Sequence, residues 1–495
     1  MNFKENLHTG KEVRKKLAIG IRKVASAVGS TMGTGGSNAI LEAIENPHHL
    51  VTNDGYSIAN AVHLSDPVEN MGKNILLEAI NRANKASGDG SSTTCVLTEA
   101  MIQEGQKHLN RQSPMELKRA LEACIPVIEK EIKEQTREIT VDDVGMVASI
   151  SAEDKEIGAR IQEIYEQIGK DGIIHWDISK TAEDSYTIGK GLTIEGSGFF
   201  SHYMNDADES GADTGRVRVK NAKVLITKQK IVNAGEFNDL FQALFQKDIK
   251  DIVVFCDEID PLVMPDLIKT RAVRGFRTIL VKMPLLWKDQ WYEDLALASG
   301  ATVIDPVLGL NHKSAKLEHL GNFDNITVTK SEVFIDGIKD LSAHIAGLQL
   351  EDTDDSNLRA SRLNTKTARY FVGAHSDSAL SYRRLKVEDA ISASWQALQG
   401  GVVIGGGLAL AKVAETIDNK ILRKALLAPY KQISKNMNRD YTEYDMLTEV
   451  VFDPAPVVLN AVKNAISVAA TVLTATTVVT LPRQEVEMPN FAVQT

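Results

Sequence analysis

The amino-terminal third of the chain carries apolar residues at the spacing of an α-helix. Within residues 11–28 they recur three or four positions apart, so that all of them share one helical face. These residues are Val13, Leu17, Ile21, Val24 and Val28. The same spacing predicts a second helix over residues 68–85, and a third is expected over residues 96–109.

Two short extended runs follow the first predicted helix, ILEA from residue 40 and HHLVT from residue 48. The second run leads into Asp54-Gly55, a dipeptide that readily supplies the positive backbone angles of a tight hairpin turn. The pattern therefore predicts a turn at this point, with Asp54 at the end of a strand.

The middle of the chain has a different pattern. Short, nearly continuous apolar runs are separated by segments of helical length, which is typical of parallel strands joined by helical crossovers. The runs are VLIT (224–227), DIVVFC (251–256), TILVK (278–282) and ATVID (301–305). Beyond about residue 389 the chain is again helical and rich in alanine and valine. We therefore predict a helical domain built from both chain ends, with an α/β domain inserted between them.

Composition narrows the class of protein. The chain has 495 residues, of which 43% are hydrophobic and 25% charged, as expected of a globular protein with several domains. Its formal net charge of -10 argues against a general nucleic-acid binder. The three cysteines, Cys95, Cys124 and Cys256, fit neither a disulfide framework nor a zinc site. With no secretory signal pattern and no run of 18 apolar residues, we expect a cytoplasmic protein without a membrane segment.

A break between two predicted helices carries the first candidate chemistry. Residues 87–95 read SGDGSSTTC, so glycine-permitted turns and hydroxyl side chains stand at the start of a helix, where anions bind readily. Asp89 would supply a hard oxygen ligand for Mg2+ shared with a phosphate group. Taken alone, such a stretch is more often a helix stop, an aspartate turn and a serine cap.

Other candidates are weak when each is considered separately. The glycine clusters TMGTGGSN (31–38) and GGVVIGGGLAL (400–410) are more typical of loops or close helix packing, and neither has the GxxxxGK[ST] form of a P-loop. Asp54 is most simply a turn former, and Asp389, in KVEDAIS, a solvated helix residue. No cluster of histidines, cysteines or nucleophile-base pairs indicates covalent catalysis.

The order and spacing of these motifs resemble the bacterial-type, GroEL-like (group I) chaperonins. TMGTGGSN, VTNDG, the run from residue 69 to residue 105, VEDA, GGVVIGGGLAL and VFDP follow one another as in that family, and the likeness extends over nearly the whole chain. The resemblance implies a divergent member, such as a virus-encoded copy, with a multidomain α and α/β fold. The expected domains are a mainly helical equatorial domain (1–133 and 400–495), a small intermediate hinge domain (134–189 and 368–399) and an inserted α/β apical domain (190–367).

The resemblance also assigns roles to residues of an ATP site. Asp89 is expected to hold Mg2+, and Asp54 and Asp389 to position the attacking water, which is the oriented-nucleophile role that phosphoryl transfer requires. Asp453 would hold the ribose. The remaining nucleotide-binding positions are Thr31, Gly33, Gly90, Ser91, Ser92 and Thr93 around the phosphates, Gly406 where the backbone approaches the nucleotide, and Ile150 and Val451 beside the base. The implied cofactors are ATP and Mg2+, with K+ as a candidate further cation.

For the apical domain the resemblance implies an apolar rim that binds non-native polypeptides. The matching positions are Phe199, Tyr203, Met204, Phe241, Met264 and Ile268. Each of them is equally compatible with ordinary domain core. The family forms homo-oligomeric rings, so a ring of seven subunits is expected, while the number of rings and the need for a co-chaperonin stay open.

Several positions depart from the family pattern. Thr34-Gly35 and Asn53 stand where the family has a lysine near phosphate, the segment 435–447 is short, and Asn238 and Lys269 make the rim more polar. Two alternatives stay open, a ring-forming scaffold or holdase with weak or no ATP hydrolysis, and a Rossmann-type enzyme. The enzyme is disfavoured because VLITKQKIVNAGEF has no GxGxxG turn after its strand.

Overall fold

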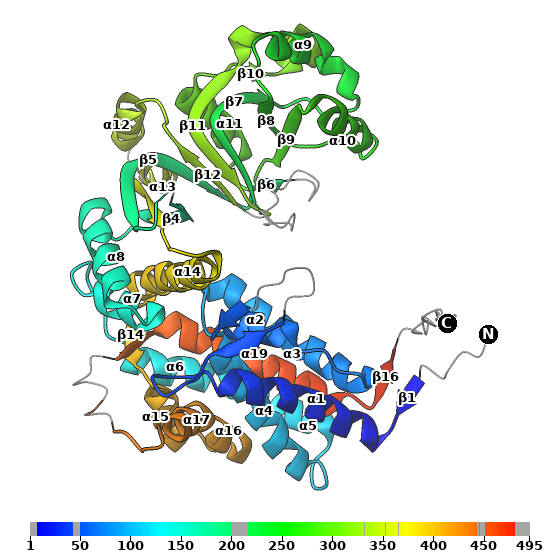
Figure 1. Ribbon diagram of the computed structural model, residues 1–495, viewed down its shortest axis with the longest axis vertical. Helices are drawn as coiled ribbons and strands as arrows, with labels where there is room; N and C mark the ends of the chain where they lie inside the picture. The colour runs from blue at the N-terminus through cyan, green and yellow to red at the C-terminus, as the bar shows by residue number, and fades with distance from the viewer. Residues whose placement is uncertain are drawn as a thin grey trace, which may run out of the picture. The chain divides into compact units, whose positions relative to one another are not determined.

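The chain divides into two compact units (Figure 1). The computed structural model describes residues 7–42, 50–179, 181–199, 216–330, 332–351, 353–364, 366–442, 445 and 451–480. The first unit consists of Met1–Lys170, Trp176–Ser185 and Phe371–Thr495, and the second of Asp171–His175 and Tyr186–Tyr370. The predicted fold class is confirmed, because both chain ends build a mainly helical unit and the α/β unit is inserted between them. The division into three domains stays a prediction, since most of the expected intermediate segments fall in the first unit.

Long helices with one buried face form the core of the first unit. Helix α1 (Lys11–Gly29) packs against α3 (Pro67–Ser87) and α4 (Ser91–His108), and α19 (Ala455–Thr474) packs against both α3 and α4. A Cβ added at Gly20 would lie 1.9 Å from the carbonyl oxygen of Glu69, so the α1–α3 crossing requires glycine at this position. Helix α19 is long and apolar enough to cross a membrane by length and composition, but most of it is buried inside this unit. Its apolar character is therefore explained by its place in the core.

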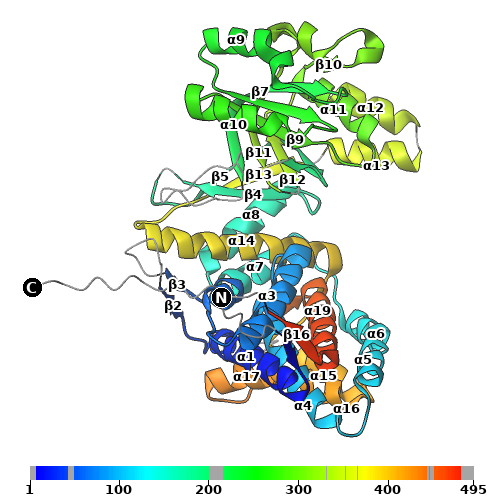
Figure 2. The ribbon, with the colours of Figure 1, turned by 90° about the vertical axis from the view of Figure 1, so that its right-hand side faces the viewer.

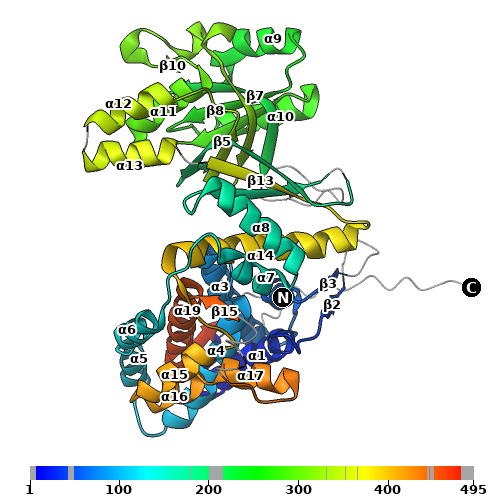
Figure 3. The same cartoon turned by 90° about the vertical axis from the view of Figure 1, so that its left-hand side faces the viewer.

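Further strands and helices complete the first unit (Figures 2 and 3). The strand pairs, all antiparallel, are β1 (Leu7–Thr9) with β16 (Thr477–Val479), β2 (Ala39–Leu41) with β3 (Leu50–Thr52), and β14 (Val402–Ile404) with β15 (Phe452–Pro454). The helices are α2 (Gly55–Ala61), α5 (Pro114–Glu122), α6 (Ile125–Gln135), α7 (Val144–Ala152), α8 (Lys155–Ile168), α14 (Asp377–Gly400), α15 (Leu408–Thr416), α16 (Lys420–Ala425) and α17 (Ala428–Met437).

A mixed sheet forms the centre of the second unit. The four predicted strands are confirmed as a parallel set in the order β10 (Val303–Ile304), β7 (Val217–Thr227), β8 (Asp251–Cys256) and β9 (Arg277–Lys282). Antiparallel strands that the sequence did not predict extend this set at both edges. They are β11 (Gly321–Val328), β12 (Glu332–Asp336) and β5 (Ser185–Glu195) beside β7, and β6 (Gly198–Phe199) beside β9. Strands β4 (Ile173–Ile178), β5 and β13 (Lys366–Val372) each contain a point at which the chain passes from one unit to the other.

Helices flank the strands of the second unit along the chain. They are α9 (Asn238–Gln246), α10 (Val263–Arg274), α11 (Lys288–Ser299), α12 (Ser342–Glu351) and α13 (Asp354–Leu363). Helices α9 and α10 follow β7 and β8 respectively, as crossovers between parallel strands do. The buried residues of strands and helices form one cluster separate from that of the first unit.

Two local predictions need correction. Asp54-Gly55 does not form a hairpin turn, because Asp54 has ordinary extended angles (φ −67, ψ 121) and is the N-cap of α2. Its carboxylate accepts hydrogen bonds from the backbone N–H groups of Tyr56 and Ser57, which a capping aspartate does as readily as a turn aspartate. Helix α4 begins at Ser91 rather than at residue 96, because serine and threonine in a first turn do not interrupt a helix.

Candidate functional site

The predicted break between two helices is present in the first unit. Helix α3 ends at Gly88 (φ +66), and α4 begins after Gly90 (φ +92), two left-handed conformations that favour glycine. The first backbone N–H groups of any α-helix have no partner within the helix, and no side chain caps them at the start of α4. The backbone N–H of Gly90 is bound by the Asp89 carboxylate at 2.5 Å. A helix start of this kind attracts anions.

Hydroxyl groups surround this helix start. Ser91 donates to Asn84 Oδ1 at 2.5 Å and is buried. Ser92 and Thr93 are half-buried, and their hydroxyls form no hydrogen bond within the described part of the chain. These two side chains are therefore available to a ligand at the start of α4.

Glycines bring two further elements against this turn. A Cβ at Gly55 would lie 2.7 Å from Ser92 Oγ, so the start of α2 touches the start of α4. A Cβ at Gly88 would lie 2.2 Å from the Cβ of Ser392 on α14. Close packing thus brings together the three elements that carry Asp54, Asp89 and Asp389.

The three aspartates lie near enough for their charges to interact. Burial raises the pKa of Asp389 well above its ordinary value, and the negative charges of Asp89 and Asp54 raise it further. Burial also raises the pKa of Asp89, to which Asp54 contributes in the same direction while the Gly90 N–H and Lys386 oppose it. Convergence of like charges is costly unless a cation compensates it, and perturbed carboxylates of this kind mark candidate functional sites.

A fourth carboxylate belongs to the same group. Asp453 lies on β15, opposite Val403 of β14, and its pKa is raised to about 7 by burial and by the charge of Asp89. Its Oδ1 lies 3.2 Å from the position a Cβ would take on Gly405. The strand pair thus brings the residue expected at the ribose toward the same acidic cluster.

Lys386 is the cation that acts on this cluster, and the sequence did not single it out. It is buried on α14, three residues before Asp389 and therefore on the same face of the helix. Its Nζ binds Glu153 Oε1 at 2.8 Å, and Asn53 Nδ2 donates to both oxygens of Glu153, at 2.9 and 3.1 Å. In the sequence, the three-residue spacing between Lys386 and Asp389 was the signal that could have identified this lysine.

The first glycine loop is held by backbone contacts. Thr31 Oγ1 donates to the carbonyl oxygens of Val28 (2.8 Å) and Asn53 (3.3 Å), which ties this loop to the residue before Asp54. At Gly33 (φ +74) a Cβ would lie 2.7 Å from Cγ2 of Ile433 on α17. The hydroxyl of Thr31 is therefore used within the chain, and the loop is fixed in place by its neighbours.

The late glycine loop is held in a similar way. Gly406 (φ +67) accepts a hydrogen bond from the Tyr441 hydroxyl, and Tyr441 is almost fully buried. Tyr441 belongs to the shortened segment, so the part of that segment that the structure describes supports the glycine loop. Val451 accepts from the N–H of Gly405 at 3.0 Å, and Ile150, on α7, is 37% exposed. Helix α7 packs against β15, which begins immediately after Val451.

The donor set fits Mg2+ bound together with phosphate rather than a metal held by protein alone. No group of three histidine, cysteine or acidic side chains within the described residues is arranged to hold a metal ion. Mg2+ ordinarily binds through one or two carboxylates and completes its shell with water and phosphate oxygens. Asp89 beside an uncapped helix start satisfies that requirement.

A groove in the second unit lies between α9 and α10. Its volume is about 690 Å3. Its lining residues are Asn238, Phe241, Gln242 and Phe245 from α9, Lys269, Thr270, Val273 and Arg274 from α10, and Phe276 after α10. They recur at three- and four-residue spacing, so one face of each helix forms a wall.

The predicted rim residues are distributed unevenly around this groove. Phe241 lines it, whereas Met264 and Ile268 are half-buried on α10 outside the lining. Phe199 is 8% exposed on β6, opposite Val281, a placement that fits ordinary core. Tyr203 and Met204 lie outside the described residues. The sequence missed Phe245 and Val273, which are 58% and 74% exposed and face the groove.

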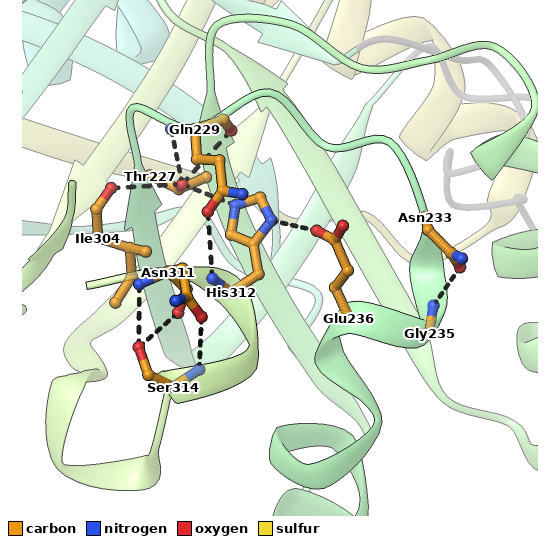
Figure 4. A network of polar contacts seen from close by, with 9 residues as sticks. All are labelled: Thr227, Gln229, Asn233, Gly235, Glu236, Ile304, Asn311, His312 and Ser314. Atoms are coloured by element: carbon orange, nitrogen blue, oxygen red, sulfur yellow. Dashed lines mark hydrogen bonds and ion pairs between the residues drawn. The ribbon is translucent and has the colours of Figure 1, made fainter. Parts of the chain in front are cut away.

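A buried polar network stands behind the α9 wall (Figure 4). His312 is 1% exposed, and its Nδ1 lies 2.7 Å from Glu236 Oε2 while its Nε2 lies 2.8 Å from Thr227 Oγ1. Burial lowers the pKa of His312, against the effect of Glu236. A neutral imidazole that donates from Nδ1 to the carboxylate and accepts from the threonine satisfies both contacts. The network joins Thr227, at the end of β7, to Glu236 in the 3-10 turn (Ala234–Phe237) that precedes α9.

A sequence profile of the TCP-1/cpn60 chaperonin family matches residues 24–425, and the chain belongs to that family. The predicted identification as a divergent GroEL-like chaperonin is thereby confirmed.

Two solved structures show the same fold. Both are crystal structures of the chaperonin gp146 from the bacteriophage EL 2 (Pseudomonas aeruginosa) in the presence of ATP-BeFx. Crystal form II matches with a TM-score of 0.70 at 16% sequence identity and covers 96% of this chain and 98% of that chain. Crystal form I matches with a TM-score of 0.64 at 16% identity and covers 96% of this chain and 99% of that chain. At this identity the likeness establishes the fold.

Proposed function

We propose that this chaperonin binds and hydrolyses ATP in the first unit and uses the energy to bind and fold non-native polypeptides in a ring of identical subunits. The observation that carries the proposal is the convergence of Asp54, Asp89 and Asp389 beside the uncapped start of α4. Members of the family are generally ATPases, and the phage relative was crystallised with an ATP analogue. The ring, its seven subunits and a cytoplasmic location are parts of the same proposal.

Each side chain of the cluster has a separate task. Asp89 holds Mg2+, which when bound neutralises phosphate charge, and the α4 start with Ser92 and Thr93 donates to phosphate oxygens. Asp54 and Asp389 orient the attacking water. The raised pKa of Asp389 makes its carboxylate a stronger proton acceptor, and a nearby cation would stabilise the ionised form. Asp453, beside Gly405, accepts from the ribose hydroxyls.

Lys386 compensates for the lysine missing at Asn53. Its ammonium group already acts on Asp89 and Asp389, so one positive charge is present in the cluster although it comes from α14 rather than from the strand end. Glu153, whose Oε1 lies 2.8 Å from Lys386 Nζ, competes with the aspartates for this ammonium group. A ligand with phosphate charge would draw the ammonium group toward itself and weaken this ion pair.

Steady-state ATPase assays on the wild type and on Asp389→Ala test the proposal. We expect Mg2+-dependent turnover that falls by about a hundredfold or more in the variant, with nucleotide binding retained, because an oriented base contributes roughly that much. Asp377→Asn, in the exposed first turn of the same helix, is the matched control. Electron micrographs of the wild type with and without ATP should show rings.

A scaffold or holdase is the second candidate, favoured by Asn53 in place of lysine and by its hydrogen bonds to Glu153. It predicts that nucleotide binds but that neither the wild type nor Asp389→Ala turns over. Rings that capture denatured protein without hydrolysis would establish it.

A further inference from the structure

The groove between α9 and α10 has an apolar face that water can reach. Phe245 and Val273 stand on opposite walls and are more than half exposed. Phe241 and Phe276 form the inner part of the lining, with their ring centroids 5.0 Å apart. At about 690 Å3 the groove falls within the range of roughly 300–1,000 Å3 that is usual for ligand sites.

The charge of the groove is opposite to that of the chain. Lys269 and Arg274 line it, and neither forms an ion pair within the part of the chain that the structure describes. No aspartate or glutamate is among the lining residues, although the whole chain carries a formal net charge of -10. Asp239 and Asp266, the acidic residues of the two helices, are exposed outside the lining. Exposed unpaired cations beside apolar surface favour a ligand that carries negative charge.

The walls are held in position before any ligand arrives. The ring of Phe237 lies 4.5 Å from that of His312 and 5.6 Å from that of Phe241, so a line of rings runs from the buried network to the groove. Glu236, bound to His312, is the last polar anchor before α9 begins. A preformed site loses less conformational entropy on binding, so weak contacts are enough to give selectivity.

We propose that this groove selects apolar polypeptide segments that carry aspartate or glutamate beside their hydrophobic residues. The inference rests on the proposed function, because it refines which non-native polypeptides the second unit binds. Apolar side chains enter between Phe245 and Val273, while Lys269 and Arg274 pair with flanking carboxylates. Positively charged segments of equal hydrophobicity bind less well because the same cations repel them.

Fluorescence anisotropy with three labelled peptides tests the proposal on the full-length protein without nucleotide. The peptides share the same leucine and phenylalanine positions and differ only in aspartate, asparagine or lysine between them. We expect the aspartate peptide to bind about tenfold more tightly than the asparagine peptide in low salt, and the lysine peptide to bind most weakly. The advantage should shrink in high salt, since exposed charges are screened there.

Charge reversal assigns the effect to the groove. Lys269→Glu/Arg274→Glu should abolish or invert the preference for aspartate while the asparagine peptide binds as before. Lys220→Glu/Lys313→Glu reverses two exposed lysines outside the groove and should leave the preference intact. Phe245→Ser/Val273→Ser removes exposed apolar contacts and should weaken all three peptides.

The outcomes separate the inference from the function on which it rests. If the serine variant loses all three peptides but the wild type binds them equally, the groove binds polypeptides and the charge selection is refuted. Equal effects of the two charge reversals would also refute it, since net charge would then be the cause. If no peptide binds, or if the serine variant binds them as the wild type does, the proposed role of the groove fails.

Discussion

The two units of this chaperonin differ in the kind of interaction that they offer to a ligand. In the first unit the incomplete interaction is electrostatic, because Asp54, Asp89, Asp389 and Asp453 act on one another with Lys386 as the nearby cation. In the second unit Arg359 forms a buried ion pair with Asp294 at 2.6 Å, and the neutral imidazole of His312 hydrogen-bonds to Glu236 at 2.7 Å. What stays exposed there is apolar surface along α9 and α10.

The proposed function relates this difference to the ligand expected for each unit. Repulsion among half-buried carboxylates is relieved by a metal ion carrying phosphate, so the first unit gains most from a charged ligand. Exposed phenylalanine and valine gain most from losing contact with water, so the second unit gains most from an apolar one.

The largest effect is expected from Asp89→Asn. Loss of the carboxylate should lower Mg2+-dependent ATP turnover by about a hundredfold to a thousandfold, because it removes a preorganised electrostatic partner of the phosphates. Peptide binding by the second unit without nucleotide should not change. The measurements are ATPase rate and peptide anisotropy, with Asp418→Asn, on the exposed surface, as control. A parallel loss of peptide binding would contradict the separation of the two units.

Gly88→Ala should have the next largest effect, on stability. The added Cβ would meet the Cβ of Ser392 at 2.2 Å and would force φ +66 on alanine, at a cost of about 2–4 kcal/mol. Hydrogen exchange of the α14 amides should therefore accelerate. Ser392→Gly in the same chain removes the clashing atoms and should restore part of the protection; no recovery would mean that the strain comes from the backbone angle alone.

A smaller effect is expected from His312→Leu in the second unit. It leaves the carboxylate of Glu236 without its 2.7 Å partner, so the start of α9 should lose about 1–3 kcal/mol of local stability, seen as faster hydrogen exchange. The double variant His312→Leu/Glu236→Met replaces both partners by apolar groups and should recover most of the loss. Equal exchange in the single and double variants would show that the network does not anchor α9. The ATPase rate is the internal control.

The smallest effect is a change in pH dependence at Asp453. Its pKa rises from 3.8 to about 7 on folding, so the folded protein holds a proton that the unfolded chain releases, and stability falls as pH rises across that interval. Above about pH 7 this contribution is constant. Asp453→Asn should flatten the fall in melting temperature between pH 5 and 7 by a few degrees at most. A wild-type melting temperature that rises with pH there and is unaffected by the substitution would refute the assignment.

Much of the fold was predictable because its signals are local. The four apolar runs predicted the parallel strands, since a strand buried on both faces needs continuous apolar residues. The antiparallel strand β11 was missed because residues 321–328, GNFDNITV, contain glycine, asparagine and aspartate, which are typical of turns and rare in strands. The groove residues Phe245 and Val273 were missed because exposure depends on how α9 and α10 lie beside each other.

By itself the sequence determined where the chain must turn. Two glycines within three residues, Gly88 and Gly90, favour a break between helices, because glycine adopts left-handed backbone angles at little steric cost. Only the tertiary structure decided that Asp54, Asp389 and Lys386 meet Asp89 at that break. Like charges repel one another, so the convergence of these aspartates depends on helix packing by residues that are distant in the sequence.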